Sequence, residues 1–191
     1  MPETPERWNA GTVHRDMWVD PDDDPRDSGA TLRGERAVLV DYLRAYRLTL
    51  EMKCDGLVAE QLARRSVPPS TLSLLGLVRH LAKVEHSWFR RVMGHDLDLP
   101  RLYWTEDQRD LDFDGAIADP AVVEDAWASW RREVAYAEQV VDRAESLDIT
   151  GAHADGPIEL REVLVHMVEE YARHCGHADL LRECIDGRVG Q

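Results

Sequence analysis

The sequence of 191 residues has no apolar run of transmembrane length, and its first residues lack the apolar core of a signal peptide. Cysteine is scarce: Cys54, Cys175 and Cys184 are an odd number, and their spacing fits neither a disulfide framework nor a zinc knuckle. The last two lie nine residues apart on one predicted helix and cannot easily pair, so we expect reduced, mostly buried thiols. These absences predict a cytoplasmic location.

Positive charge is also scarce, because 23 basic residues face 37 acidic ones and the formal net charge is −14. A surface of this sign argues against nucleic acid or an anionic membrane as the main partner. The sequence contains no glycine-rich phosphate loop and no legible Ser/His/Asp or Cys/His nucleophile pattern. With 43 % hydrophobic residues, it has the composition of an ordinary globular protein and the length of one domain with a real core.

Strand patterns are essentially absent, and four long segments have helical spacing instead. They cover about 34–54, 70–94, 119–144 and 158–186, with Ser70 and Asp119 as predicted N-caps and Gly187 as the residue that ends the last helix. Four helices of this length predict an all-α four-helix bundle, in which the long segment 94–118 serves as a crossover loop.

The chain divides into two parts on composition. Residues 1–32 are polar and rich in proline and aspartate, so we expect an irregular arm, in which Trp8 and Trp18 are the only candidates to dock on the body. Residues 33–191 form the predicted bundle domain.

The last predicted helix carries a polar stripe. His166, Glu170, His174 and His177 are spaced by 4, 4 and 3 residues, which places them on one helix face, and an aliphatic residue stands at each end of the row. A row that begins and ends with aliphatic side chains is typical of a face that passes through the core. Burying a carboxylate among imidazoles is costly unless they are paired or bound to a cation.

His80 supplies a complement on the second long helix, where it lies on a broad apolar surface. Helices that face each other in a bundle bring such side chains together, so His80, Glu170 and His174 form a candidate metal site with an open position for water or substrate. Zinc or ferrous iron would suit two imidazoles and one carboxylate. The alternatives are a core histidine bonded to a carbonyl, and a simple charge pair between Glu170 and His174.

The remaining histidines have weaker predictions. His166 and His177 are candidates for positions behind the ligands or at the rim of the site. His14, His86, His95 and His153 fall in the arm, on the outer helix face or in loops, and we interpret them as surface residues.

Two motifs carry a family resemblance. The stretches VPPSTLSLLGLVRHLAKVEHSWFRRVM and LVHMVEEYARHCGHADLLRECIDG resemble the DinB-like metalloprotein superfamily, in particular its actinobacterial branch of mini-circle proteins, over roughly residues 33–190. The resemblance implies a divalent metal held by His80, Glu170 and His174. The position of Glu170 is histidine in many relatives but glutamate in the related mycothiol-dependent maleylpyruvate isomerases, and His177 could replace Glu170 at the metal. Zinc is the favoured ion, with iron, nickel or manganese as the other candidates.

The resemblance also implies a reaction. Several members of the superfamily act on low-molecular-weight thiols, so the leading hypothesis is a metal-dependent thiol S-transferase that uses mycothiol or a similar thiol and an electrophile. In this hypothesis Tyr103 and Trp104 of the segment 94–118 cover the pocket, and Arg173 is a candidate contact for an anionic group of the thiol. The chain ends just after the fourth predicted helix, without the additional C-terminal domain of the isomerases, so isomerase activity itself is not expected.

Two other classes of protein stay open at this point. One is a non-catalytic metal-binding bundle, a stress or interaction protein whose ion staples the helices together. The other is a metal-free bundle that dimerises through an apolar face, since homodimers are common among such folds.

Overall fold

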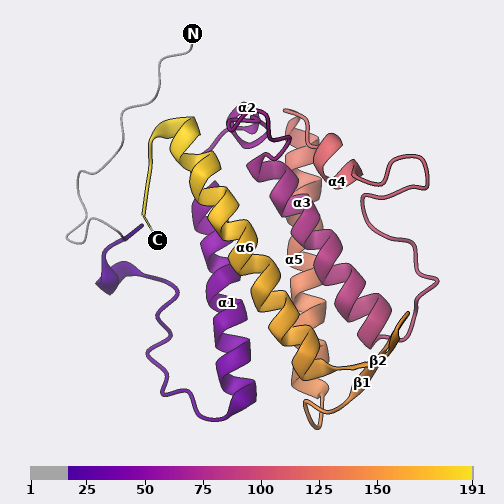
Figure 1. Cartoon of the computed structure of the whole chain (residues 1–191). Coiled ribbons are helices and arrows are strands. Elements are labelled where there is room, and N and C mark those ends of the chain that lie inside the picture. The colour runs from indigo at the N-terminus through magenta and orange to yellow at the C-terminus, as the bar shows by residue number, and fades with distance from the viewer. Residues whose placement is uncertain (1–16, 191) are drawn as a thin grey trace.

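Four long helices lie side by side in the computed structural model, which describes residues 17–190 (Figure 1). They are α1 (Glu35–Cys54), α3 (Leu74–Glu85), α5 (Pro120–Arg143) and α6 (Leu160–Asp186). The shorter elements are the 3₁₀ turn η1 (Pro21–Asp23), α2 (Ala59–Leu62), the π-helix η2 (His86–Met93), α4 (Leu111–Asp114) and the strands β1 (Thr150–His153) and β2 (Gly156–Glu159). The prediction of a mostly helical fold is confirmed. No helix among the described residues has both the length and the apolar character needed to span a membrane.

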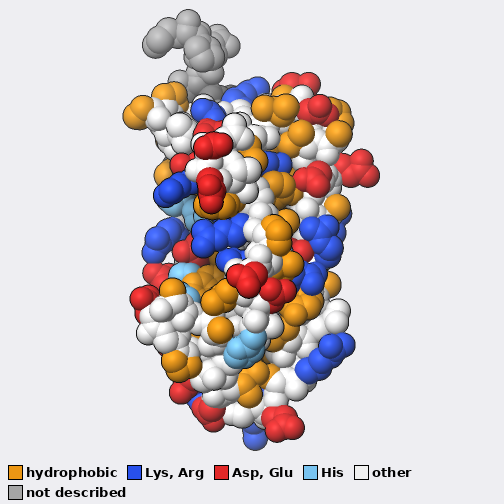
Figure 2. Space-filling view, turned by 90° about the vertical axis from the view of Figure 1, so that its right-hand side faces the viewer, with side chains coloured by type: hydrophobic (Ala, Val, Ile, Leu, Met, Phe, Trp, Pro, Cys, Tyr) orange, Lys and Arg blue, Asp and Glu red, His pale blue; other side chains and the backbone are white. Residues whose placement is uncertain are grey.

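The helices pair in a fixed pattern: α1 packs against α6, α3 packs against α5, and α3 also contacts α6. After η2 the segment 94–118 returns along the molecule to α4, which packs on α3 (Figure 1). As a result, α3 and α5 run in the same direction, which a short connection would not allow. The side that carries this segment mixes acidic, basic and hydrophobic side chains, so the acidic excess is not gathered there (Figure 2).

Local capping explains where α3 and α5 begin and where α6 ends. The Asp119 side chain accepts a hydrogen bond from the Ala121 N–H at 2.8 Å, as predicted, and Gly187 ends α6 in the left-handed conformation with φ of 79°. The prediction for Ser70 was wrong, because Ser73 caps α3 by accepting a hydrogen bond from the Gly76 N–H. Ser70 lies instead in the turn that follows the two prolines, where its N–H bonds to the Val67 carbonyl.

The second predicted helix is not α-helical to its end. From His86 onward it continues as a π-helix, and the Gly94 N–H bonds to the Phe89 carbonyl five residues earlier. The wider turn changes the direction of the side chains relative to an α-helix. The prediction that His86 is a surface residue was wrong: it is buried, with Nδ1 3.4 Å from the Glu133 carboxylate and Nε2 3.0 Å from the Pro100 carbonyl.

A small β-hairpin corrects the prediction that strands are absent. β1 and β2 pair antiparallel, with Thr150 opposite Glu159 and His153 opposite Gly156. Each strand has only four residues, and alternation is hard to detect at that length, so the sequence pattern does not reveal them. The hairpin contacts η2 and leads directly into α6.

The described part of the arm, residues 17–32, is irregular apart from η1, and Trp18 docks on the body as expected. Trp18 is 2 % exposed, with the Lys53 amine 3.9 Å and the Arg188 guanidinium 3.8 Å from the centre of its ring. Trp8 and His14 lie outside the described residues. All three cysteines are free; Cys54 and Cys175 are buried and Cys184 is exposed.

A polar network crosses the apolar core and takes one side chain from each long helix. Arg47 of α1 donates to both oxygens of Glu85 of α3 at 2.8 and 2.9 Å. The Tyr171 hydroxyl of α6 donates to Glu85 at 2.8 Å, and the Trp130 indole of α5 donates to Tyr171 at 2.7 Å. We call these four residues the closed network, because every member is buried and is hydrogen-bonded to another member. Such a network specifies the register of all four helices.

Candidate metal centre

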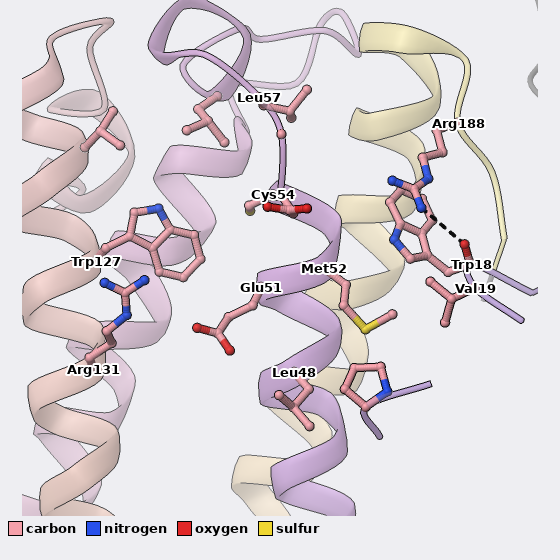
Figure 3. A pocket seen from close by; sticks show the side chains of 15 residues that line it. Trp18, Val19, Leu48, Glu51, Met52, Cys54, Leu57, Trp127, Arg131 and Arg188 are labelled. Carbon is pink, nitrogen blue, oxygen red and sulfur yellow. Dashed lines mark hydrogen bonds between the residues drawn. The ribbon is translucent and has the colours of Figure 1, made fainter. Parts of the chain in front are cut away.

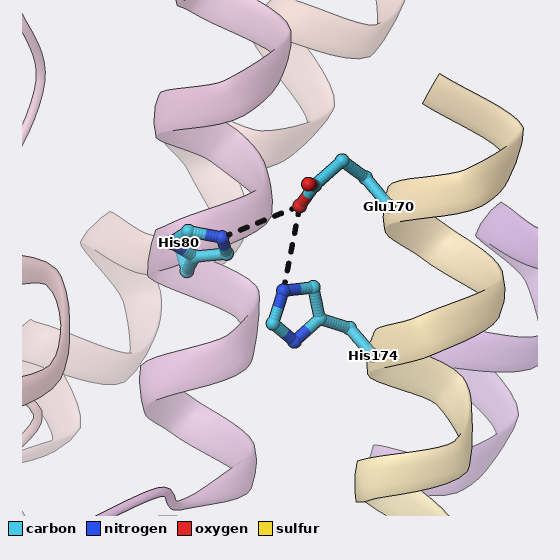
Figure 4. Close-up of side chains that lie close together, drawn as sticks. All are labelled: His80, Glu170 and His174. Carbon is cyan, nitrogen blue, oxygen red and sulfur yellow. Dashed lines mark ion pairs between the residues drawn. The ribbon is translucent and has the colours of Figure 1, made fainter. Parts of the chain in front are cut away.

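The polar stripe of α6 faces α3, and His80 stands opposite it. Glu170 and His174 project from consecutive turns of α6, and their carboxylate and imidazole converge with the His80 ring between the two helices (Figure 4). The Glu170 Oε2 atom lies 3.4 Å from His174 Nε2 and 3.7 Å from His80 Nε2. We call His80, Glu170 and His174 the open cluster, because these distances exceed ordinary hydrogen-bond lengths and leave room between the three groups.

The donor set fits a divalent ion. One ligand atom from each residue of the open cluster lies within 4.8 Å of the others. Two ligand atoms that are each about 2.0–2.1 Å from a tetrahedral ion lie about 3.3 Å apart, so the separations of 3.4 and 3.7 Å need only a small adjustment. Two imidazoles and one carboxylate are the first ligands of many catalytic zinc sites and also suit iron.

His80 is oriented from behind by a residue that the sequence analysis missed. Asp112, 1 % exposed, lies 2.9 Å from His80 Nδ1, and the Lys83 amine bonds to the same carboxylate oxygen at 3.1 Å. The carboxylate accepts the Nδ1–H, so the Nε2 lone pair is directed at the open cluster, the arrangement that a metal-binding histidine adopts. Phe113 stacks on the His80 ring with a centroid distance of 5.0 Å. Nothing in the sequence singles out Asp112 among the many acidic residues of the segment 94–118.

His174 has an analogous partner in His177, one turn later. The two Nδ1 atoms are 3.3 Å apart, so one ring donates and the other accepts. Burial and the neighbouring His174 lower the pKa of His177, which favours the neutral ring that can accept from the Nδ1–H of His174. The Nε2 lone pair of His174 is then available on the Glu170 side. The structure thus places His177 behind His174, and Glu170 with His80 and His174.

His166 stands at the edge of the open cluster, one turn before Glu170. Its Nε2 atom is 3.9 Å from Glu170 Oε1, and the Trp88 ring packs on it with a centroid distance of 4.8 Å. It is half-buried and also lines the hollow beside the hairpin.

The charges of these groups depend on one another. The neighbouring imidazoles of His174 and His80 hold the pKa of Glu170 far below its usual range. Burial alone would lower the pKa of His80, but its hydrogen bond with Asp112 and the nearby Glu170 carboxylate raise it. Burial would likewise raise the pKa of Asp112, and its bonds to His80 and Lys83 lower it. The lowered pKa values of Glu170 and Asp112 favour their ionised forms, and ionised carboxylates beside the imidazoles favour the binding of a cation.

The other predicted site residues lie outside the open cluster. The Tyr103 hydroxyl donates to the Asp125 carboxylate at 2.7 Å, and the Arg79 guanidinium lies 3.8 Å from the centre of the Tyr103 ring. The Arg101 guanidinium lies 5.1 Å from the centre of the Trp104 ring. The lid role of Tyr103 and Trp104 stays a prediction. The segment 94–118 reaches the cluster through Asp112 and Phe113 instead. Arg173 is exposed and pairs with Glu169 at 2.8 Å.

The helical fold, its crossover and the inward-facing histidines and glutamate define a protein of the DinB-like class. The family model described as mycothiol-S-transferase matches residues 38–187, and the chain belongs to this DinB-like family. The fold is similar to the crystal structure of a conserved protein from Enterococcus faecalis, with a TM-score of 0.61 and 15 % identity over 83 % of this chain and 99 % of that one. At that identity the likeness concerns the fold alone. A comparison with curated proteins found no match.

Proposed function

We propose that the protein is a DinB-like four-helix bundle that binds one divalent ion through His80, Glu170 and His174 and joins a small thiol, mycothiol or a similar compound, through its sulfur to an electrophile. The observation that carries the proposal is the convergence of three ligand atoms within 4.8 Å of one another, in a chain of the mycothiol-S-transferase family.

The chemistry follows from the residues present. A divalent ion at this site would lower the pKa of a thiol next to it and so favour the thiolate, the nucleophilic form. The thiol S–H bond breaks and its proton leaves. A sulfur lone pair then forms the bond to the electrophilic carbon, while the leaving group departs with the electron pair of the broken bond.

The chain's own residues divide the remaining tasks. Asp112 and His177 hold the rings of His80 and His174 with their Nε2 atoms toward Glu170. His166 Nε2, at the edge of the cluster, is the nitrogen placed to accept the thiol proton and release it to water. Phe113 covers the His80 ring and limits the access of water from that side.

Zinc is the proposed ion, because imidazole and carboxylate ligands in a set of three suit it, with iron, nickel or manganese as rivals. The test is the metal content of untagged protein by mass spectrometry, measured beside His174→Ala. His95→Ala is a matched control, since His95 is exposed and its ring bonds to the Thr150 carbonyl outside the cluster. We expect about one ion per chain in wild type and in the control, and loss of the ion in His174→Ala.

Absence of an ion in wild type, after exposure to zinc, nickel, manganese and ferrous iron, would contradict the proposal and favour the metal-free bundle. An ion without any consumption of a model electrophile by a series of small thiols would favour the non-catalytic metal-binding protein. The cytoplasmic location and the homodimer stay predictions.

A further inference from the structure

The bundle is open along the side between α1 and α5. α1 packs against α6, and α3 packs against both α6 and α5, but α1 and α5 are not one of the closely packed pairs. A cavity of about 580 Å³, within the usual range for small-molecule sites, lies at this side. Residues of α1, α5, the arm and the segment after α1 contribute to its wall, and none of the open-cluster residues lines it. We call it the α1–α5 cleft.

We propose that the α1–α5 cleft binds a small zwitterion with an apolar side chain, that is, an apolar α-amino acid. Glu51 holds the ammonium group, Arg131 holds the carboxylate, and Trp127 contacts the side chain. The inference goes beyond the proposed function and does not rest on it, because it uses neither the metal site nor the thiol chemistry.

Two opposite charges that face each other without pairing are the first argument. Glu51 of α1 and Arg131 of α5 extend toward each other across the cleft, next to the Trp127 ring (Figure 3). The charge of Arg131 acts on Glu51, yet neither side chain makes a hydrogen bond or an ion pair within 4.0 Å to another residue of the described chain. A ligand that carries both charges can satisfy both side chains at once.

The burial of Glu51 is the second argument. Glu51 is half-buried, and burial raises the pKa of its carboxyl more than the charge of Arg131 lowers it. A half-buried carboxylate without a hydrogen-bond donor is costly, so its ionised form gains from an ammonium group that enters the cleft. Arg131 is exposed, and its planar guanidinium suits a carboxylate at the mouth of the cleft.

The apolar part of the wall is the third argument. Trp127 is half-buried, and its ring stands perpendicular to that of Trp130 at a centroid distance of 5.5 Å. The Arg131 guanidinium lies 5.5 Å from the centre of the Trp127 ring, so the charged and the aromatic group are neighbours. Aliphatic side chains complete this part of the wall: Leu48, Leu62 and Val123. Such a surface favours an aromatic or aliphatic side chain over a polar one.

A second hollow continues the cleft toward the closed network. It has about 210 Å³, and Leu48, Glu51 and Arg131 line both hollows. Arg47 and Trp130 of the closed network form part of its wall. The two charged groups therefore stand where the hollows meet, with room for a side chain next to them.

The part of the cleft on the other side of α1 is a poorer place for the ligand. Trp18 and Arg188 lie there, away from Glu51 and Arg131 (Figure 3). Arg188 donates to the Trp18 carbonyl at 3.2 Å, and its guanidinium lies 3.8 Å from the centre of the Trp18 ring. These contacts are made within the fold, so we place the ligand on the side of α5.

The experiment compares ligands that differ in their charged groups, by calorimetric titration of the full chain at neutral pH. L-Phenylalanine carries both charges, phenethylamine lacks the carboxylate, and 3-phenylpropionate lacks the ammonium group. We expect wild type to bind phenylalanine at least about tenfold more tightly than either of the others, since one charge-assisted hydrogen bond is enough for this ratio. L-Serine, which keeps both charges but has a polar side chain, should also bind more weakly than phenylalanine.

Two variants assign the charges one at a time. In Glu51→Gln the advantage of phenylalanine over 3-phenylpropionate should disappear, and in Arg131→Gln its advantage over phenethylamine should disappear. Arg143→Gln is the matched control, because Arg143 is an exposed arginine of the same helix that does not line the cleft. Thermal unfolding of each variant without ligand checks that it is folded.

Three results would each overturn the inference. They are the lack of saturable binding of phenylalanine at millimolar concentration, tighter binding of phenethylamine than of phenylalanine, and an unchanged preference in both Glu51→Gln and Arg131→Gln. The titration is repeated on protein treated with a chelator, where we expect the same preference. A protein without metal or thiol chemistry can therefore still confirm this site, and an active thiol transferase can still refute it.

Discussion

Two groups of buried and half-buried polar side chains share the helices α3 and α6, and their carboxylates find their partners in opposite ways. The closed network and the open cluster both draw on α3 and α6, and Tyr171 of the first follows Glu170 of the second directly in sequence. In the closed network Glu85 receives hydrogen bonds of 2.8–2.9 Å from Arg47 and Tyr171. In the open cluster the corresponding separations are 3.4 and 3.7 Å.

The difference teaches how to distinguish a structural polar group from a binding one. The arginine of the closed network is an internal cation that satisfies the buried carboxylate without any ligand. The open cluster has no such residue between its three members, and its imidazoles are instead held from outside by Asp112 and His177. Side chains that are positioned from behind and separated in front are arranged for something that enters between them.

The largest expected effect comes from breaking the closed network. Arg47→Ala leaves Glu85 buried without its cation, and we expect a loss of about 3–5 kcal/mol in the free energy of unfolding, measured by urea denaturation. Arg173→Ala removes an exposed ion pair with Glu169 and should cost less than about 1 kcal/mol. Equal losses of stability in Arg47→Ala and Arg173→Ala would contradict the claim that Arg47 compensates a buried carboxylate.

A second closed arrangement predicts a pH dependence. Burial alone would raise the pKa of Glu133, but hydrogen bonds from one histidine and two arginines lower it to about 2. These partners are His86, Arg90 and Arg132. A carboxyl whose pKa is depressed in the folded state adds stability above its ordinary pKa, and this contribution is lost as the pH falls from about 4.5 to about 2.

The measurement is the free energy of unfolding across that pH window. We expect wild type to lose up to about 3 kcal/mol more than Glu133→Gln between the two limits. Glu124→Gln, an exposed position on the same helix, should behave like wild type. If the free energy of unfolding had the same pH dependence in wild type and Glu133→Gln, the hydrogen bonds to Glu133 would contribute nothing to stability.

If the proposed ion is bound at the open cluster, its removal should affect only that group of residues. An ion that binds the folded chain at about 100 times its Kd stabilises it by about 2.7 kcal/mol, so chelation should lower the Tm of wild type. His80→Ala should start at the lower Tm and not respond to the chelator, whereas Arg47→Ala should still respond. A chelator-insensitive wild type that nevertheless contains the ion would mean that the ion is not coupled to the fold.

The smallest effect concerns the residue behind His80. Asp112→Asn keeps the size of the side chain but weakens its hold on the Nδ1–H, and we expect about 10- to 100-fold weaker metal binding in a competition titration. Asp114→Asn is the control, because Asp114 lies on the same short helix with an exposed side chain that contacts Arg65. An unchanged metal affinity in Asp112→Asn would show that Asp112 does not contribute to the proposed metal site.

Much of the open cluster follows from the sequence, because helical spacing is a local property. The 4-residue interval between Glu170 and His174 puts both on one face of α6 as soon as the helix forms. His80 on the apolar surface of the second long helix was a candidate partner on the same grounds. The stop at Gly187 and the cap at Asp119 are also local, and they were predicted correctly.

Helical character and the polar stripe were thus determined by the sequence itself, since each needs only contacts within a few residues. Tertiary structure alone decided the remainder: that Asp112 reaches His80 across 32 residues, that Arg47 finds Glu85 across 38, and that the wide turn at His86 buries its ring against Glu133. Pairings over such separations leave no periodic trace in the chain. They form only when the packing of four helices and a crossover brings the partners within hydrogen-bond distance.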